Sequence, residues 1–142
     1  MEIVKVDINN LDYAQQARKL FFNSDNGALN EKFFEKKDNI MVVGILDKQV
    51  IAMVYGYQLE RFSSKSHQLF IYSIDVLEKY QGQGYGKKIL DAFLEPYYKG
   101  ECSNAFVFTH ENNINALKLY QSLGAKIINS EEGHDVLLEW TK

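Results

Sequence analysis

The sequence has 142 residues, with 16 Lys and Arg against 19 Asp and Glu, and 46% of its residues are apolar. These values predict a single domain, residues 1–142, large enough to bury a core of its own. The net charge of −3 argues against a nucleic acid as the main partner, because phosphate binding needs an excess of clustered Lys and Arg. A single cysteine, Cys102, excludes an internal disulfide and offers no zinc-ligand spacing, which favours a reducing compartment and a fold without metal.

The N-terminal segment does not resemble a signal peptide. Residues 1–7 alternate charged and apolar side chains, without an apolar stretch that small residues follow. No apolar run approaches the roughly 20 residues that cross a bilayer as a helix. We therefore expect a cytoplasmic protein without a membrane partner.

Taken in chain order, the first half of the sequence predicts four strands and two helices. A strand over 2–6 precedes a helix over 11–21, with Asn9 and Asn10 as candidate caps, and a turn at 23–27 ends this helix. A second, short helix is expected over 31–37. Strands follow over 40–46, 50–62 and 69–77, joined by a hairpin turn at 47–49 and a polar turn at 63–67. These last three strands are expected to form an antiparallel meander.

The second half predicts alternating helices and strands. A glycine-rich loop over 81–86 leads into a helix over 87–98, which Pro96 should kink or end. A strand over 105–109 and a helix over 113–123 follow, and Gly124 ends that helix. Two strands, over 126–128 and 135–140, complete the chain. This order of elements indicates an α/β or α+β domain with a mixed sheet.

The glycine-rich loop is the first signal of chemistry. It places backbone N–H groups and the positive end of a helix dipole around one concavity, which suits a phosphate. Glycine is required where a Cβ would keep phosphate oxygens from the amides or would resist positive φ. A glycine-rich turn without a ligand is the alternative. The loop consists of Gln81, Gly82, Gln83, Gly84, Tyr85 and Gly86.

Two common phosphate-binding motifs do not fit this loop. A P-loop has four residues between its glycines and then Lys followed by Ser or Thr, whereas Gly82 and Gly86 enclose three residues and Lys87 precedes Lys88. The dinucleotide fingerprint follows a first strand and needs a third glycine where Lys87 stands. Nucleotide hydrolysis and Rossmann-type binding are therefore disfavoured.

The loop instead resembles the acetyl-CoA loop of the GCN5-related N-acetyltransferase (GNAT) family, Gln/Arg-x-x-Gly-x-Gly/Ala. In that family the loop follows a strand ending in an aliphatic-x-Val segment, here Ile74-Asp75-Val76. A second family motif, Asn-x-x-Ala-x-x-x-Tyr before an aliphatic-Gly step, matches Asn113, Ala116 and Tyr120 with 123–124.

The resemblance covers essentially the whole chain and implies both a fold and a cosubstrate. The fold is the GNAT-type acyl-CoA N-acyltransferase fold, an α/β (α+β) arrangement in which helices flank a mixed, mostly antiparallel sheet. The cosubstrate is acetyl-CoA, used as acetyl donor without a metal. The residues that the resemblance assigns to acetyl-CoA are Ile74, Asp75, Val76, Gln81, Gly82, Gln83, Gly84, Tyr85, Gly86, Asn113, Ala116 and Tyr120.

Several of these residues also have a purely structural explanation. By resemblance, 74–76 pair with the pantetheine arm through their backbone, while Ile74 and Val76 are ordinary core side chains. Asn113 would bond the pantetheine region, and an N-cap of the helix over 113–123 explains it equally well. Tyr120 matches the family tyrosine that protonates the departing thiolate, and a core tyrosine on an amphipathic helix is the alternative.

The general base is the least defined part of the predicted site. An attacking amine must be neutral, so a base or a water chain to one is needed near the acceptor. In aminoglycoside-acetylating relatives an acidic residue follows the strand tyrosine, but here Ser73 follows Tyr72. Asp75, on the same strand face as Ser73, is the first candidate and Glu60 the second. Either carboxylate is alternatively a solvated surface charge. The three histidines show no metal-ligand spacing.

The function that these signals favour is direct acetyl transfer from acetyl-CoA to a primary amine of a small cationic molecule, such as an aminoglycoside. Within the family, the segment 57–86 is most similar to small aminoglycoside 3-N-acetyltransferases, with Leu59, Phe62 and the Ile71-Tyr72 pair in register. Two alternatives stay open: a protein or peptide N-acetyltransferase, and a non-catalytic acyl-CoA-binding regulator. Homodimers are common in the family, and no residue of this sequence fixes an interface.

The charge is unevenly distributed along the chain. Residues 1–60 hold seven Lys and Arg and nine Asp and Glu, residues 61–100 hold six and four, and residues 101–142 hold three and six. The segment that bears the glycine-rich loop is thus the cationic one. This distribution favours an anionic cosubstrate and a cationic acceptor.

Overall fold

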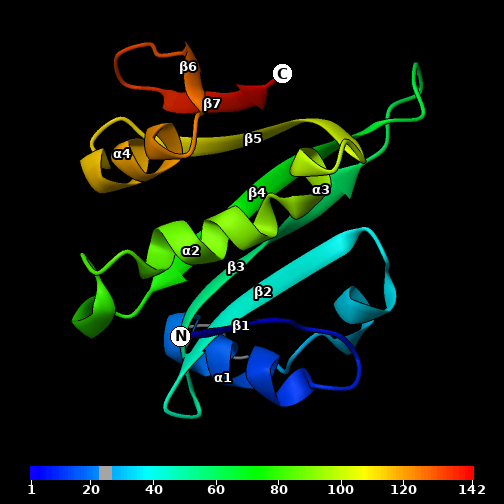
Figure 1. The fold of residues 1–142 in the computed structure, drawn as a ribbon, viewed down its shortest axis with the longest axis vertical. Coiled ribbons are helices and arrows are strands. Elements are labelled where there is room, and N and C mark those ends of the chain that lie inside the picture. Colours follow the sequence, from blue (N-terminus) through cyan, green and yellow to red (C-terminus); the bar gives the residue numbers. More distant parts are fainter. Residues whose placement is uncertain (23–26) are drawn as a thin grey trace. The chain divides into compact units, whose positions relative to one another are not determined.

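The computed structural model describes residues 1–22 and 27–142, which form two compact units. Unit 1 comprises Met1–Gly56 and Ser73–Phe93, and unit 2 comprises Tyr57–Tyr72 and Leu94–Lys142. Strands β3 (Gln49–Leu59) and β4 (His67–Val76) contribute residues to both units. Figure 1 shows the order of the elements along the chain. The expectation of one domain over 1–142 stays a prediction.

The strands are ordered β1-β2-β3-β4-β5-β7-β6 in the sheet. The pairs β1–β2, β5–β7 and β6–β7 are antiparallel, while β4 and β5 are parallel. The predicted mixed, mostly antiparallel sheet is therefore confirmed, and β2, β3 and β4 are neighbours in chain order, as a meander requires. The strands are β1 (Glu2–Lys5), β2 (Asn39–Leu46), β3 (Gln49–Leu59), β4 (His67–Val76), β5 (Cys102–His110), β6 (Lys126–Asn129) and β7 (Asp135–Thr141).

The α-helices of unit 1 are α1 (Leu11–Phe21) and α2 (Tyr85–Phe93), and those of unit 2 are α3 (Glu95–Tyr98) and α4 (Ile114–Ser122). Unit 1 also contains two 3-10 helices. Glu31–Glu35 precedes β2, and Glu78–Tyr80 lies between β4 and α2. The first replaces the short helix predicted over 31–37. The turn predicted at 23–27 falls almost entirely outside the described residues.

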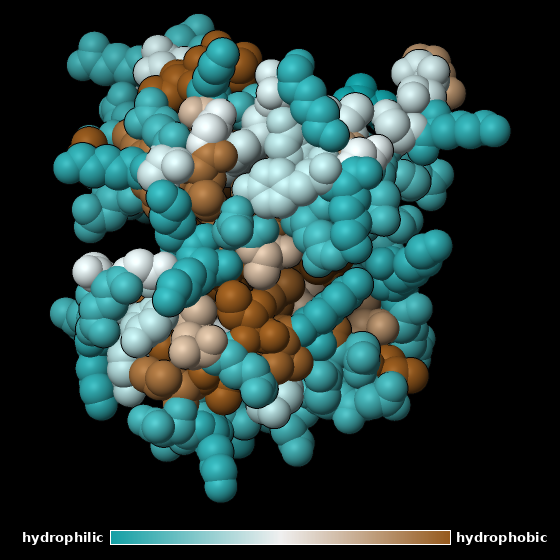
Figure 2. Space-filling view, viewed as in Figure 1, coloured by the Kyte–Doolittle hydropathy of each residue, from teal (hydrophilic) through white to brown (hydrophobic). Residues whose placement is uncertain are grey.

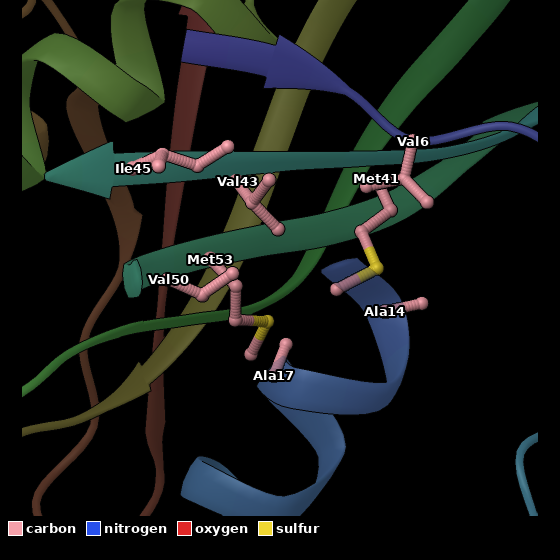
Figure 3. Packing of buried hydrophobic residues seen from close by; sticks show 8 residues of the cluster. All are labelled: Val6, Ala14, Ala17, Met41, Val43, Ile45, Val50 and Met53. Atoms are coloured by element: carbon pink, nitrogen blue, oxygen red, sulfur yellow. The ribbon is translucent and has the colours of Figure 1, made fainter. Parts of the chain in front are cut away.

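The core of unit 1 forms where α1 packs on β2 and β3. Figure 3 shows Met41 directed toward Ala14 and Met53 toward Ala17. Both alanines are buried, and their small side chains let the helix approach the strands closely. Full burial of each methionine contributes about 1.5–3 kcal/mol relative to exposure, so this contact fixes the face that α1 presents to the sheet.

The hairpin between β2 and β3 is tighter than predicted. Its two central residues, Asp47 and Lys48, have φ angles of 51° and 67°, as a two-residue turn with the twist of its flanking strands requires. Gln49 is consequently the first residue of β3 rather than part of the turn. At the other end β3 stops at Leu59, three residues short of the prediction, so Glu60 lies beyond the strand.

The helix predicted over 87–98 is two helices. Because the Lys88 amide donates to the Gly84 carbonyl at 3.2 Å, the first turn of α2 already contains Tyr85 and Gly86. The helix is interrupted at Leu94, between α2 and α3. Pro96 lies in the first turn of α3, where a backbone N–H would have no hydrogen-bond partner within the helix, so proline is tolerated there. The predicted interruption is correct, while its position was wrong by two residues.

The predicted cap of α1 is correct in position and wrong in mechanism. Asn10 is the N-cap residue, but its side chain does not bond the first helical turn. Instead Asn10 Oδ1 accepts from the Asp7 amide at 2.7 Å and Nδ2 donates to the Lys5 carbonyl at 3.2 Å. The side chain therefore stabilises the turn between β1 and α1 rather than the helix itself.

The face of the molecule that Figure 2 shows is mostly polar. In Figure 2 hydrophilic residues cover most of the visible face, and hydrophobic residues show through in separate patches. Within the described residues, no helix is long and apolar enough to span a membrane.

Candidate functional site

In unit 1 the glycine-rich loop connects the end of β4 to α2. Gln81 Nε2 donates to the Val76 carbonyl at 2.9 Å, and Gln83 Nε2 donates to the Lys79 carbonyl at 3.3 Å. Both glutamine side chains thus bond backward to the segment that precedes the loop. These contacts hold the loop as a defined turn, and the exposed residues 81–84 remain open to solvent.

Gly82 and Gly84 are required for their backbone conformation and not because a side chain would lack space. Gly82 and Gly84 have φ angles of +76° and +86°, in the region that L side chains rarely adopt. A Cβ built on either would meet nothing within 4 Å. The backbone is consequently uncovered here, at the N-terminus of a nine-residue helix. First-turn N–H groups have no partner within their helix, so this geometry fits an anion.

Cationic side chains adjoin the same helix terminus. Lys87 and Lys88 lie exposed in the first turn of α2, and Lys88 Nζ is 5.9 Å from the centroid of the Tyr85 ring. The Tyr85 ring in turn contacts Tyr80 edge-on, at 6.3 Å between centroids. The loop therefore combines open amides, a helix dipole and two nearby ammonium groups.

The end of β4 carries the first candidate base. Ser73 Oγ donates to Asp75 Oδ2 at 3.3 Å, and both side chains are half-buried. Burial raises the pKa of Asp75, and the hydrogen bond from Ser73 opposes that shift. Ile74 and Val76 alternate with this pair and are also half-buried. They therefore lie at the margin of the core, and the prediction that they are ordinary core residues is wrong.

In unit 2 the second motif lies on α4. Asn113 Oδ1 accepts from the Ala116 amide at 3.2 Å, so Asn113 is the side-chain N-cap of α4. This is one of its two predicted roles, and the cap leaves its Nδ2 group uncommitted to the helix. Tyr120, one of the predicted catalytic residues, is buried with 4% exposure, and its ring meets Trp140 edge-on at 6.1 Å between centroids.

The C-terminus of α4 is anchored in the same unit. Trp140 Nε1 donates to the Leu123 carbonyl at 3.1 Å, and the Ala125 amide donates to the Tyr120 carbonyl at 3.1 Å. Gly124 takes a φ of +102°, which lets the chain leave the helix as predicted. These contacts hold Tyr120 in a defined orientation on α4.

The second candidate base, Glu60, is exposed beyond the end of β3. Its neighbour Arg61 donates to Asn104 Oδ1 at 2.9 Å and to Ser103 Oγ at 3.2 Å. Glu60 is therefore a surface carboxylate, whereas Asp75 is half-buried. Over residues 1–22 and 27–142, no three His, Cys, Asp or Glu side chains gather as metal ligands.

Unit 2 also contains an aromatic cluster that the sequence patterns did not single out. The rings of Phe70 and Phe106 are stacked, with centroids 4.8 Å apart and planes 7° apart. Alternating aromatics on each strand were visible in the sequence. That β4 and β5 lie side by side could not be read from it, since a long crossover separates them. We call the cluster, Tyr57, Phe70, Tyr72, Phe106 and Phe108, the aromatic face.

Comparison with known proteins assigns the family. A profile of the acetyltransferase (GNAT) family matches residues 9–125. Because this match covers most of the chain, the protein belongs to the GNAT family, as its two motifs predict.

Individual relatives are more distant. A spermine/spermidine N(1)-acetyltransferase from Bacillus subtilis (strain 168) is 36% identical over 64 residues, which are 43% of this chain and 41% of that protein. The match thus spans less than half of this curated relative.

Solved structures share the fold. An aminoglycoside acetyltransferase, meta-AAC0020 from an uncultured soil metagenomic sample, superposes with a TM-score of 0.80 at 23% identity over 94% of this chain and 92% of its own. Arabidopsis thaliana Naa50, in complex with the bisubstrate analogue CoA-Ac-MVNAL, gives a TM-score of 0.73 at 16% identity over 100% of both chains. At these identities the similarity defines the fold.

Proposed function

We propose that this protein transfers an acetyl group from acetyl-CoA to a primary amine of a small cationic molecule. The observation that carries the proposal is the loop in unit 1, where two glycines at positive φ uncover backbone amides at the N-terminus of α2. Membership of the GNAT family makes the pyrophosphate of acetyl-CoA the anion that this loop would hold.

The loop residues suit that cosubstrate in chemistry as well as in conformation. Amides of Gly82 to Gly86 would bond the phosphate oxygens, and Lys87 and Lys88 would offset their charge. The Gln81 amide, which the resemblance also assigned to the phosphates, donates to the Glu78 carbonyl at 3.2 Å instead. The backbone of Ile74, Asp75 and Val76 would hold the pantetheine arm, with Asn113 and Ala116 as its further contacts. When bound, acetyl-CoA supplies a thioester, whose carbonyl carbon is the electrophile of the reaction.

The acceptor has to lose a proton before or during its attack. In the proposed reaction the amine nitrogen forms a bond to the acetyl carbon as the carbon–sulfur bond breaks, and the excess proton passes to Asp75. The raised pKa of Asp75 makes its carboxylate a stronger base than an ordinary aspartate. Glu60, being exposed, is the second candidate for this role.

The departing thiolate needs a proton in return. Tyr120 is the proposed donor, because a phenol can protonate a thiolate and because the contacts around Tyr120 hold its ring in place. A protein made only to bind acyl-CoA would not need this hydroxyl.

The finer substrate class rests on several observations together. The chain is acidic overall and most acidic over residues 101–142, which suits a polyamine or an aminoglycoside. The curated relative acts on spermine and spermidine by its name, and a structural neighbour is an aminoglycoside acetyltransferase. A peptide acceptor has distant fold similarities in its favour, such as that to Naa50.

The deciding experiment is Tyr120→Phe, assayed by thiol release from acetyl-CoA across a panel of polyamines, aminoglycosides and peptides. We expect kcat to fall by roughly 10² to 10⁴ with every accepted amine, the usual contribution of a general acid. Affinity for CoA, measured by calorimetry, should not change. Tyr13→Phe, which removes a phenol hydroxyl from α1 in unit 1, is the matched control.

Two outcomes would count against the proposal. An unchanged kcat in Tyr120→Phe would remove Tyr120 from the mechanism. Tight CoA binding by the wild type without turnover of any amine or peptide would favour the acyl-CoA-binding regulator instead.

A further inference from the structure

Trp140 on β7 links the C-terminal end of α4 to the sheet within unit 2. Its indole Nε1 donates to the carbonyl of Leu123, the C-cap residue of α4, at 3.1 Å. A Cβ built on Gly124 would lie 4.0 Å from Trp140 Cδ1, so the indole also lies against the next residue of the chain. Trp140 therefore contacts the segment in which the chain leaves the helix.

The hydrogen bond from the indole satisfies an acceptor at the end of α4. The last carbonyl groups of an α-helix have no partner within the helix and need a donor from outside it. The Tyr120 carbonyl accepts from the Leu123 and Ala125 amides, at 3.2 and 3.1 Å. These two donors belong to the segment that follows the helix, whereas the donor to the Leu123 carbonyl comes from a different strand. The last turn of α4 is thus tied to β7 through the Trp140 side chain.

The same indole contacts the ring of Tyr120. The two rings meet edge-on, with centroids 6.1 Å apart and planes 76° apart. Trp140 is 2% exposed and Tyr120 is 4% exposed, so the contact is shielded from water. Aromatic rings prefer this arrangement, because the positive edge of one ring meets the negative face of the other. Trp140 therefore restrains Tyr120 twice, through the helix backbone and through the ring.

The sheet leaves room for the indole at this position. In the antiparallel register Trp140 lies opposite Ala105 on β5, whose methyl side chain is completely buried. Directly opposed residues of paired strands place their side chains on the same face of the sheet. A larger side chain at position 105 would compete with the indole for the space between the sheet and α4.

We propose that Trp140 is a positioning residue for Tyr120, which holds the last turn of α4 and the phenol ring so that the hydroxyl keeps the orientation needed to donate its proton. Tyr120 lies near the end of α4, where helices fray. Misplacement of a reacting group by about 1 Å can lower a rate by about a hundredfold. This inference rests on the proposed acetyl transfer, in which Tyr120 protonates the departing thiolate, and adds the residue on which its orientation depends.

The test is a double-mutant cycle between Trp140 and Tyr120, assayed by thiol release from acetyl-CoA. Trp140→Leu removes the indole, and we expect it to lower kcat by roughly tenfold to a hundredfold with little change in the KM for acetyl-CoA. Trp140→Phe keeps a ring and removes the N–H group, so it should lower kcat by a smaller factor and should fold even if Trp140→Leu does not. In the Tyr120→Phe background both substitutions should change kcat by less than about twofold, because no hydroxyl is left to position.

Hydrogen exchange provides a measurement that needs neither acetyl-CoA nor turnover. Trp140→Phe should speed the exchange of the Ala125 amide, whose acceptor is the Tyr120 carbonyl, by roughly fivefold. Tyr97→Leu is the matched control, since Tyr97 is a buried aromatic residue of unit 2 whose ring contacts Tyr98 and Lys142. This control should lower Tm and leave kcat and the exchange of the Ala125 amide unchanged.

The outcomes distinguish this inference from the proposed function. If Tyr120→Phe lowers kcat but the Trp140 variants lower it equally in both backgrounds, acetyl transfer through Tyr120 stands and Trp140 has only a structural role. An unchanged exchange rate in Trp140→Phe, or a loss of kcat in Tyr97→Leu as large as in Trp140→Phe, would likewise overturn the inference. A Tyr120→Phe variant with full kcat would remove the role of Tyr120 itself. Should no amine be acetylated, the proposed function fails, and the exchange of the Ala125 amide still decides whether Trp140 fixes the end of α4.

Discussion

At the residue scale, burial and hydrogen bonding act in opposite directions on Asp75. Burial raises its pKa above the ordinary value of 3.8, and the bond from Ser73 Oγ lowers it, with burial the larger effect. A pKa that is higher in the folded state means that the folded protein binds the proton more tightly than the unfolded chain does. Ionised Asp75 therefore opposes folding, and this opposition appears as the pH rises through its raised pKa.

Asp75→Asn should remove this opposition while keeping an acceptor for Ser73. Because the effect exists only where Asp75 is ionised, the gain in Tm of Asp75→Asn over the wild type should be larger at about pH 8 than at about pH 4. Thermal unfolding across this range measures it. If the increase in Tm were independent of pH, burial would not be raising the pKa of the Asp75 carboxyl group.

The same residue pair predicts a shift in the activity profile if Asp75 is the base. Ser73→Ala removes the hydrogen bond that lowers the Asp75 pKa, so the acidic limb of kcat/KM should move to higher pH. Glu60→Gln is the comparison, because Glu60 is exposed and is the competing base. A limb that Glu60→Gln abolishes and Ser73→Ala leaves in place would assign the role to Glu60.

At the scale of elements, the conformation of the glycine-rich loop can be separated from its role in binding. Gly84 has a φ of +86° and Gly133, in the turn between β6 and β7, has +82°, and neither position would crowd a Cβ. Gly84→Ala and Gly133→Ala should each cost about 1–2 kcal/mol of unfolding free energy, through the backbone alone. Denaturant unfolding measures this cost.

Binding should distinguish the two loops. Gly84→Glu places a carboxylate at the open amides, so we expect CoA affinity by calorimetry to fall by about tenfold or more, on the scale of one charge interaction. Gly133→Ala should leave CoA affinity unchanged. An unchanged affinity in Gly84→Glu would show that the phosphates lie elsewhere.

For Asn113, at the N-terminus of α4, the capping role can likewise be tested apart from a role in CoA binding. Asn113→Ala should cost about 1 kcal/mol of unfolding free energy, because the Ala116 amide loses its acceptor, whereas Asn113→Ser keeps a capping oxygen. If Asn113 also bonds the pantetheine arm, both variants should weaken CoA in calorimetry. Retained affinity in Asn113→Ser would leave the cap as its sole role.

At the scale of the whole molecule, the net charge of −3 would favour the approach of the cationic acceptor that we propose. This attraction is long-range and is screened over a Debye length of about 10 Å at 0.1 M salt. The KM for spermidine should therefore rise with added NaCl, while the KM for an amine carrying a single charge should rise less. Equal slopes for the two amines would argue against steering by the charge of the protein.

Much of the fold could be predicted because its signals are local. Apolar spacing identified α1 and α4, and residue type and position identified Asn113 as the cap and Gly124 as the end of α4. The loop motif likewise depends on six consecutive residues whose backbone angles glycine permits. The predicted ends of helices and strands were less accurate, as at the end of β3 (Leu59) and the start of α2 (Tyr85). A strand ends where its pairing with neighbouring strands ends, and a helix begins at its first backbone hydrogen bond, and neither is visible in the local sequence.

The sequence by itself determined the family and the location of the glycine-rich loop, because both depend on short motifs with local geometry. Only the tertiary structure decided the half-buried environment of Asp75, the packing of Tyr120 against Trp140 and the existence of the aromatic face. Phe70 and Phe106 are brought together by parallel pairing of strands that are far apart in the chain. Such pairing depends on how all the strands share one sheet, which no local spacing of residues encodes.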